Sequence, residues 1–299
     1  MNLEIFEKAK ILFEKGLSLS QEECYDLAEK KFLESLDLIP ERLSTIYNLI
    51  SIYVITNQKK KLQELLEKYK HLSNEKEILY GLAFNFHFND KFSESIKICQ
   101  ELIQYKELKY SIQDLLASNY KHKKLFLDSL KIYQKKLREK KNYLIYYNIG
   151  CLFFDLGMIH KAYYYFNKSK ELKDIDNSNL WNLSLCALTL EKFKYGFSLY
   201  EYRWNKKINP LIKKFPEIKS PNNLTEIIDK KILISDEQGL GDTLQFSRFV
   251  IDLLKYTKNI TFVVNSKLSK ILSNLNTNIN VINYDNLELD NFDYQIPLC

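Results

Sequence analysis

The chain has 299 residues, of which 45% are hydrophobic and 27% are charged. This length is enough for about two domains with cores of their own, and the composition excludes both a small disulfide-stapled scaffold and a disordered chain. Gly and Pro are scarce, at 7 and 5 residues, so we expect long uninterrupted elements.

The net charge of +6 comes from the N-terminal two thirds of the chain. Residues 1–210 contain 34 basic and 27 acidic side chains, whereas residues 211–299 contain 10 and 11. The longest basic run, Lys59–Lys61, is typical of a solvated helix face. Because the basic residues are spread among acidic neighbours, the sequence predicts no nucleic-acid partner.

The five cysteines include no Cys-x-x-Cys pair, and four of them fall in apolar helical patterns. This indicates buried thiols rather than disulfides or zinc ligands. Buried thiols are typical of a reducing compartment, so we expect a cytoplasmic protein. The first residues alternate charged and apolar side chains, and no stretch has the roughly 18 apolar residues of a membrane span. The sequence therefore predicts neither a signal peptide nor a membrane anchor.

An internal repeat of 33 or 34 residues runs through the first two thirds of the chain. Its marker is a mostly small residue followed four positions later by a large one. The marker pairs are Ala28/Phe32, Leu62/Leu66, Ser95/Cys99, Ser129/Tyr133, Ala162/Phe166 and Gly196/Tyr200. A second column twelve residues earlier is Gly16, Ile50, Ala83, Ala117, Gly150 and Ser184. A third column nine residues before the marker is Leu19, Tyr53, Phe86, Tyr120, Phe153 and Ala187.

This alternation of side-chain size is typical of paired antiparallel helices, which approach closely only where one helix presents a small side chain. We expect each unit to be a helical hairpin in which a small residue on the second helix receives a large side chain from the first. The alternative is an irregular helical bundle. The period and the columns resemble the tetratricopeptide repeat over about residues 9–208, in about six hairpins. The resemblance implies a solenoid whose concave face, lined by the first helices, holds a protein or peptide.

Asparagines recur on the predicted first helices. They are Asn48, Asn85, Asn119, Asn148 and Asn182. One interpretation is a ladder that hydrogen-bonds the backbone of a ligand, and the other is polar residues that each satisfy one local partner. We favour the second, because a buried or surface Asn normally needs only one such partner.

The pattern changes after Trp204, where three prolines indicate a linker over residues 209–229. Short β-branched runs at 231–235, 260–264, 279–283 and 294–296 then alternate with helical stretches at 243–256 and 266–275. Strand–helix alternation predicts a parallel sheet with right-handed crossovers. The predicted fold is an α-solenoid of tetratricopeptide-like helical hairpins at 1–208, followed by a partial α/β Rossmann-like domain at 230–299.

The loop after the first strand, residues 236–243, is the candidate ligand site, because open parallel sheets bind ligands beyond the carboxyl ends of their strands. Its two glycines allow positive φ and close backbone approach, and a helix start directs N–H groups at an anion. The predicted phosphate-binding residues are Gly239, Gly241, Thr243, Gln245 and Arg248. Leu244 replaces the third glycine of the dinucleotide fingerprint, which disfavours NAD. No cofactor is predicted, and the spacing of the four histidines predicts no metal site.

Three segments of this sequence carry a second resemblance. They are Gly196–Trp204 (GFSLYEYRW), Glu237–Arg248 (EQGLGDTLQFSR) and Asp293–Leu298 (DYQIPL). Together they resemble bacterial proteins in which tetratricopeptide repeats precede a glycosyltransferase-like domain of the heptosyltransferase (GT-B) type. The resemblance implies that Asp242 is the general base for an acceptor hydroxyl. The alternative for Asp242 is capping of the helix that follows, and for Glu237 a satisfied loop carboxylate is favoured.

The same resemblance implies a donor-binding half that this sequence does not contain, so the α/β part is interpreted as a truncated half. A nucleotide sugar is expected as a partner only with a complementing domain. The first predicted function is a protein-interaction scaffold joined to an incomplete glycosyltransferase-like domain. The alternative is a glycosyltransferase component that transfers a sugar to a protein or glycan. An exposed apolar sheet edge is expected near residues 279–299.

Overall fold

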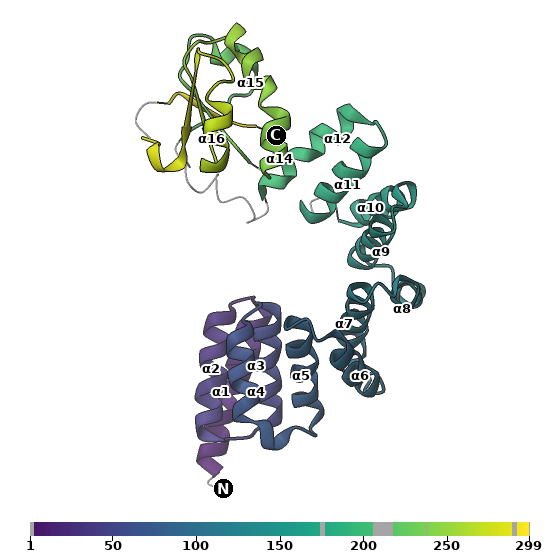
Figure 1. The fold of residues 1–299 in the computed structure, drawn as a ribbon. Helices are drawn as coiled ribbons and strands as arrows, with labels where there is room; N and C mark the ends of the chain where they lie inside the picture. The colour runs from purple at the N-terminus through teal and green to yellow at the C-terminus, as the bar shows by residue number, and fades with distance from the viewer. Residues whose placement is uncertain (1–2, 174–176, 206–217, 238, 289–291, 299) are drawn as a thin grey trace. The chain divides into compact units, whose positions relative to one another are not determined.

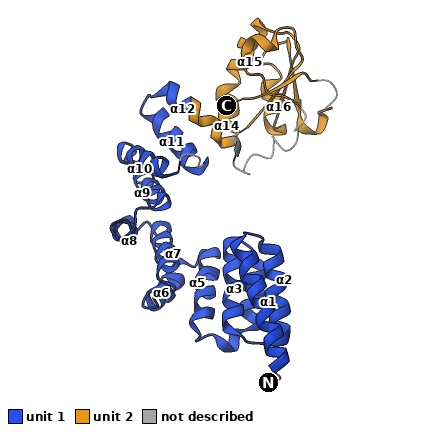
Figure 2. Cartoon of the chain, turned by 180° about the vertical axis from the view of Figure 1, so that it is seen from behind, with its two compact units in different colours: residues 1–197 blue, residues 198–299 orange. Residues whose placement is uncertain are grey.

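The computed structural model describes residues 3–173, 177–205, 218–237, 239–288 and 292–298. The chain divides into two compact units, Met1–Phe197 and Ser198–Cys299, which are coloured separately in Figure 2. Unit 1 is helical, and unit 2 contains a small sheet with short helices. The expected switch from helical hairpins to alternating strands and helices is therefore confirmed.

Unit 1 consists, over its described residues, of six helical hairpins that follow one another along the chain (Figure 1). The first helices are α1 (Leu3–Gln21), α3 (Leu43–Ile55), α5 (Lys76–Phe88), α7 (Lys109–His122), α9 (Tyr143–Asp155) and α11 (Asn177–Thr189). The second helices are α2 (Tyr25–Leu38), α4 (Lys59–Lys68), α6 (Phe92–Leu102), α8 (Phe126–Glu139), α10 (Ile159–Leu172) and α12 (Phe193–Tyr200). A 3-10 turn, η1 (Lys70–Leu72), follows α4.

Each hairpin turns at one residue in the left-handed region, with φ between 55° and 69°. These residues are Glu23, Asn57, Asp90, Lys124, Gly157 and Glu191. The next residue along donates its N–H to the carbonyl of the third sequence column at 2.8–2.9 Å, a bond that ends the first helix. The turns recur every 33 or 34 residues, as the repeat predicts.

At two second-column glycines the helices of a hairpin are in close contact. A Cβ added to Gly16 would lie 2.6 Å from the Phe32 ring, and one added to Gly150 would lie 2.6 Å from the Phe166 ring. At these two hairpins the large side chain comes from the second helix and the small residue from the first, which is the reverse of the direction we expected. At the sixth hairpin the expected direction holds, because a Cβ added to Gly196 of α12 would lie 2.6 Å from the Leu188 side chain of α11. The predicted size alternation is present, and its direction differs between hairpins.

Two of the small marker residues also form hydrogen bonds across their hairpins, which the sequence did not predict. The hydroxyls of Ser95 and Ser129 donate hydrogen bonds to the carbonyls of Ala83 and Ala117, at 2.7 and 2.8 Å. Both acceptors belong to the second column. A small residue is needed there because the backbones of the two helices come close enough for a hydroxyl to bridge them. These four residues are fully buried, so the core runs along the hairpin seams.

Unit 2 is built on a four-stranded, all-parallel sheet in the order β3-β2-β1-β4. The strands are β1 (Ile232–Ser235), β2 (Ile260–Val264), β3 (Ile279–Asn283) and β4 (Tyr294–Pro297). Between them lie α14 (Leu240–Phe246), α15 (Arg248–Asp252), η4 (Leu253–Lys255), α16 (Ser266–Leu272) and η5 (Tyr284–Asn286). All four predicted strands are present. The helix expected at 243–256 begins earlier, at Leu240, and is interrupted at Ser247.

Both faces of this sheet carry apolar side chains. One face buries Ile232, Ile234 and Phe262 against Val250 and Leu268 of the helices. The other buries a smaller cluster centred on Leu233 and Val263. Alternate residues of each strand point to opposite faces, so a continuous apolar run is what a strand covered on both sides requires.

The boundary between the units lies at Phe197/Ser198, eleven residues before the position expected from the repeat. The 3-10 turns η2 (Glu201–Asn205) and η3 (Leu224–Ile227) both belong to unit 2. Pro210 and Pro216 of the expected linker lie outside the described residues.

The two edge strands, β3 and β4, both fall in the range where we expected an apolar edge. On β4, the Gln295 backbone N–H donates to the carbonyl of Lys219 at 2.8 Å, and its side-chain amide donates to that of Ile218 at 2.7 Å. Part of this edge is therefore covered by the segment before η3.

Candidate functional site

The loop between β1 and α14 leaves the carboxyl end of a central strand, between β2 and β4. Its first residue, Asp236, is 9% exposed, and both of its carboxylate oxygens accept local bonds. One oxygen accepts the backbone N–H of Asn265 at 2.8 Å, and the other accepts the Tyr284 hydroxyl. Burial and this hydrogen bond raise the pKa of Tyr284. Asp236 thus joins the carboxyl ends of three strands.

Glu237 forms a buried ion pair with Arg203 of η2. Arg203 Nε donates to Glu237 Oε1 at 2.7 Å and Nη2 donates to Oε2 at 3.2 Å, and the two side chains are 8% and 4% exposed. Arg203 Nη1 also bonds Glu201 at 2.9 Å. Burial lowers the pKa of Arg203, but the bonds from Glu237 and Glu201 outweigh it and the pKa is raised. The favoured expectation for Glu237, a satisfied loop carboxylate, matches this geometry, but nothing in the sequence pattern pointed to Arg203 as the partner.

Gly239 and Asp242 form the first turn of α14. Gly239 is the N-cap, with φ of −74°, and Gly241 lies within the helix, so neither uses the positive φ that we expected of the two glycines. Asp242 is the third helical residue rather than the cap, because the helix begins three residues earlier than the sequence indicated. Its Oδ2 accepts the Gly239 N–H at 3.1 Å. A capping role for Asp242 is therefore present, in the form of a bond back to the N-cap residue.

The other predicted ligand residues lie on α14 and at the start of α15. Thr243 is buried and its hydroxyl donates to the Gly239 carbonyl at 3.1 Å, so it faces the helix. Gln245 and Arg248 are exposed, and the Arg248 guanidinium lies 4.8 Å from the centre of the Phe249 ring. A Cβ on Gly241 would meet nothing within 4 Å, which leaves open space beside the turn.

Two cavities lie between successive hairpins of unit 1, and first helices supply most of their walls. One, of about 300 Å³, is lined by Ser44, Tyr47, Asn48, Lys76, Glu77, Glu107 and Leu108. The other, of about 450 Å³, is lined by Tyr110, Asp114, Lys136, Lys140, Asn142, Leu144, Ile145 and Asn148. We call them the first and second inter-hairpin cavities. Each combines apolar side chains with amides and charges.

The five asparagines do not share one role. Asn119 is fully buried, where it donates to Ser95 Oγ and pairs with His87, each at 2.7 Å. Asn182 donates to the Tyr147 hydroxyl at 3.2 Å. Asn48 donates to a backbone carbonyl of its own helix. These local partners agree with the favoured interpretation, and of the five only Asn48 and Asn148 line the two cavities.

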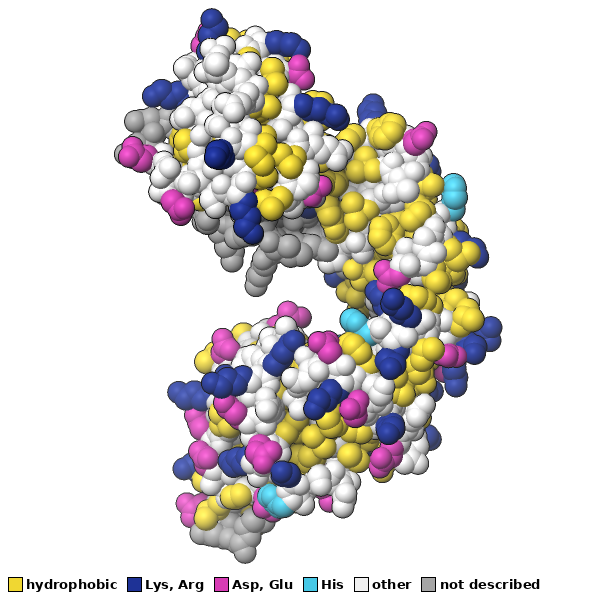
Figure 3. Space-filling view, viewed as in Figure 1, with side chains coloured by type: hydrophobic (Ala, Val, Ile, Leu, Met, Phe, Trp, Pro, Cys, Tyr) yellow, Lys and Arg dark blue, Asp and Glu magenta, His cyan; other side chains and the backbone are white. Residues whose placement is uncertain are grey.

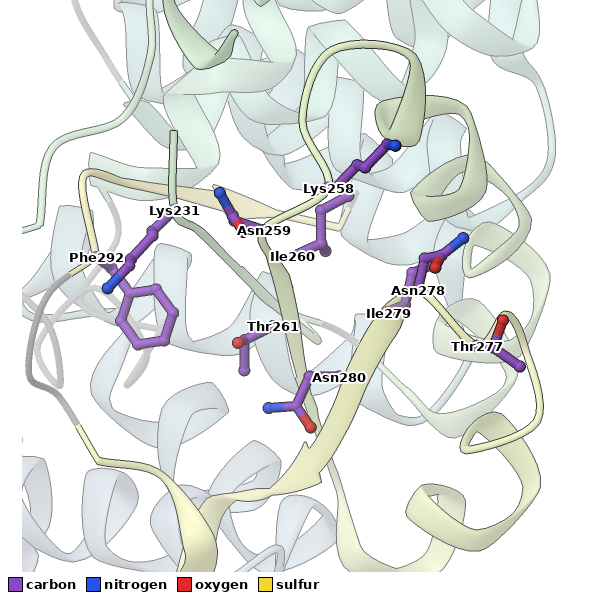
Figure 4. A pocket seen from close by; sticks show the side chains of 10 residues that line it. All are labelled: Lys231, Lys258, Asn259, Ile260, Thr261, Thr277, Asn278, Ile279, Asn280 and Phe292. Atoms are coloured by element: carbon purple, nitrogen blue, oxygen red, sulfur yellow. The ribbon is translucent and has the colours of Figure 1, made fainter. Parts of the chain in front are cut away.

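A further cavity, of about 590 Å³, lies on unit 2 at the amino ends of the strands (Figure 4). Its lining includes Lys231, Lys258, Asn259, Asn278 and Asn280. The two lysine side chains point in different directions, so their ammonium groups do not converge (Figure 4). This cavity is at the opposite end of the sheet from the loop after β1.

No protein-family model matches the chain, and none of the curated proteins matches it. Solved structures do match. PilW, a widely conserved type IV pilus biogenesis factor, aligns with a TM-score of 0.55 and 16% identity over 70% of this chain and 94% of its own. Pseudomonas aeruginosa PilF aligns with a TM-score of 0.51 and 15% identity over 71% and 94%. A thermophilic TPR protein of Thermus thermophilus aligns with a TM-score of 0.51 and 13% identity over 60% of this chain and 99% of its own.

At these identities the likeness shows the fold. Unit 1 is a solenoid of tetratricopeptide-like hairpins, as the repeat columns predicted. Across the described residues, no helix combines the length and the apolar character that crossing a bilayer requires.

Proposed function

We propose that this protein is an interaction scaffold that binds a segment of a partner protein along the first helices of its hairpins. The supporting observation is the pair of inter-hairpin cavities, each walled by residues of neighbouring hairpins and each offering polar groups beside apolar surface. A cavity of this kind binds one side chain of an extended segment. The amide and charged groups beside the cavity then favour particular residues next to that side chain in the segment.

Selection of short peptides from a displayed library on the full chain tests this function. Asn48→Trp fills the first inter-hairpin cavity, and Asn148→Trp fills the second. We expect at least one of these changes to weaken the selected peptides by about 10-fold or more, a loss of about 1.4 kcal/mol. Glu94→Trp, on α6 and away from both cavities, is the control. Peptides that bind all three variants equally well would contradict the proposal.

The second candidate function is that of a glycosyltransferase component whose acceptor-binding half is unit 2. It is favoured by the parallel strand order β3-β2-β1-β4, which is that of one half of a Rossmann-like sheet, and by the open space beside Gly241 at the carboxyl end of β1. In this proposal Asp242 takes the proton of an acceptor hydroxyl. Gly239, Gly241, Gln245 and Arg248 contact the ligand, Thr243 supports the turn through its bond to Gly239, and a complementing domain supplies the nucleotide sugar.

Asp242→Asn separates catalysis from capping, because the amide oxygen of Asn can still accept the Gly239 N–H but cannot act as a base. The assay measures sugar transfer from radiolabelled nucleotide sugars, with candidate donor-binding domains added, alongside the melting temperature. We expect transfer to be lost at an unchanged melting temperature. Transfer that survives the substitution, or that falls only together with stability, would exclude Asp242 as the base.

A further inference from the structure

The net charge of the whole chain resides in one hairpin. Residues 121–141 contain nine basic and two acidic side chains, a net charge of +7. The other 278 residues contain 35 basic and 36 acidic side chains. The comparison of residues 1–210 with residues 211–299 does not show this concentration, because acidic residues balance the basic ones in the rest of unit 1.

Few of these basic side chains are neutralised. Lys121 pairs with Asp155 and Lys131 with Asp128, each at 3.0 Å, and Lys136 is held by Asp114. Six others are exposed and form no side-chain hydrogen bond or ion pair within the described part of the chain. They are Lys123, Lys124, Lys135, Arg138, Lys140 and Lys141. We call these six residues the basic face.

The basic face lies at the two ends of α8. Lys135 and Arg138 are three residues apart in the C-terminal half of α8, so they lie on one side of the helix, the side that also carries the paired Lys131. Lys123 and Lys124 precede the helix, and the remaining two lysines follow it. Lys and Arg side chains gather over α8 at the right-hand edge of the view in Figure 3. The unpaired charges therefore group at the two ends of a helix roughly 20 Å long, with the Lys131–Asp128 pair between them.

The basic face adjoins the second inter-hairpin cavity, because Lys140 belongs to both. Leu144, Ile145 and the Tyr110 ring give that cavity its apolar wall. Lys136, whose side chain is only 6% exposed, also lines it and is fixed by Asp114 and by the Tyr110 carbonyl at 3.2 Å. An apolar recess therefore adjoins a row of unpaired cations.

We propose that the basic face and the second inter-hairpin cavity together bind an acidic polypeptide segment, with its carboxylates along α8 and an apolar side chain in the cavity. This rests on the proposed scaffold function and specifies the chemistry of its partner. Five of the six cations are lysines, which act as point charges rather than as planar forks for phosphate. Between Lys123 and Lys141 the aromatic residues are Phe126 and Tyr133, which are half-buried and buried, so no exposed ring on which a nucleic-acid base would stack alternates with the six cations along the sequence.

The test is fluorescence anisotropy of the full chain with a labelled peptide in which two leucines precede a tract of about ten glutamates, at about 50 and 200 mM salt. We expect binding that weakens at the higher salt, and Lys135→Glu/Arg138→Glu to reduce it by about 10-fold or more. The control is Lys8→Glu/Lys10→Glu, which replaces two exposed lysines on α1 and changes the net charge by the same amount. We expect it to alter binding by less than about 2-fold. Replacing the two leucines of the peptide by serines is expected to weaken it by about 5-fold or more.

Equal losses for the α8 and the α1 variants would show a response to net charge alone and would overturn the proposal. Tighter binding of this face to single-stranded DNA, or to vesicles rich in phosphatidylserine, than to the peptide would overturn it as well. Library peptides that lose binding with Asn48→Trp, but keep it with Lys135→Glu/Arg138→Glu, would refute the acidic segment while leaving the scaffold function standing.

Discussion

The residues that close the hairpins show how a single backbone position sets the repeat length. Five of the six turns place a residue other than glycine in the left-handed region, and only Gly157 is free of the steric cost. The spacing of these residues was not used in the repeat columns, yet it has the same period. Sequence reasoning missed the turns because Glu, Asp, Asn and Lys there carry no glycine signal.

Replacing Glu191 by glycine should therefore stabilise the protein, by about 0.5–1 kcal/mol, because φ of 59° strains any residue with a Cβ. Gly157→Ala should destabilise it by a similar or larger amount for the same reason. Urea unfolding of both variants measures the difference. Shifts of the same sign in the two variants would contradict this account of the turns.

A histidine pair occupies the junction of the third and fourth hairpins. The His122 ring stacks on Phe92 at 4.6 Å, with an angle of 7° between the rings, and lies 5.5 Å from the His87 ring. Partial burial lowers the pKa of His122, and the charges of His87 and Lys121 lower it further, against the opposing effect of Asp90 and Asp155. The folded protein therefore binds a proton at His122 less readily than the unfolded chain.

This lowered pKa makes the junction weaker in acid. The stability contribution is complete above the ordinary histidine value of 6.5 and is lost as the pH falls through the folded pKa. We expect the urea midpoint to fall between about pH 7.5 and 5.5, and His122→Phe to reduce that fall. His160→Gln, in another hairpin, is the control. A fall of the same size in His122→Phe would show that other groups cause it.

At the scale of elements, side-chain size fixes how the helices pair. The sequence columns marked the positions of the contacts, but not which helix supplies the large residue in each hairpin, which is the first helix at Gly196 and the second at Gly16 and Gly150. That depends on where each Cβ points once two helices cross, and a Cβ at Gly150 would point into the Phe166 ring. The start of α14 was also missed, because Asp242 is a good cap in sequence while Gly239 takes that place in the fold.

Gly150→Ala is the direct test of this packing. The added methyl would lie 2.6 Å from Phe166, so we expect a loss of about 1–3 kcal/mol in the free energy of unfolding. Adding Phe166→Leu should recover part of it by making room, whereas Phe166→Leu alone should destabilise. If the residues did not touch, the losses in free energy of unfolding caused by Gly150→Ala and by Phe166→Leu would add in the double variant. A double-mutant cycle measures whether they add or whether the second change recovers part of the first loss.

At the scale of the whole molecule, one buried ion pair ties the residues after the last hairpin to the α/β unit. The Arg203–Glu237 pair joins residues 34 positions apart and places the end of the repeat segment in the α/β unit. It also joins two of the three segments that carry the glycosyltransferase resemblance. A buried pair of this kind is costly to break, because either partner alone remains charged and desolvated.

A fragment of residues 198–299 should therefore be more stable than one of residues 209–299, by about 3–5 kcal/mol, since the shorter one leaves Glu237 without Arg203. Circular dichroism during urea unfolding measures both. In the full chain, Lys255→Ala removes an exposed ion pair with Asp252 and should change stability by less than about 1 kcal/mol. Identical midpoints for the two fragments would show that the pair does not define the unit.

The sequence by itself determined the repeat length, the six hairpins, the four strands and the switch between the two parts, because these follow from local periodicity and side-chain size. Only the tertiary structure decided the bonding of the loop after β1. Asp236, Glu237 and Asp242 are close together in the sequence. Their partners are a backbone amide and a tyrosine that directly follow the neighbouring strands β2 and β3, an arginine 34 residues earlier and a glycine N–H. Two of these three sets of partners lie far along the chain, and folding alone brings them together.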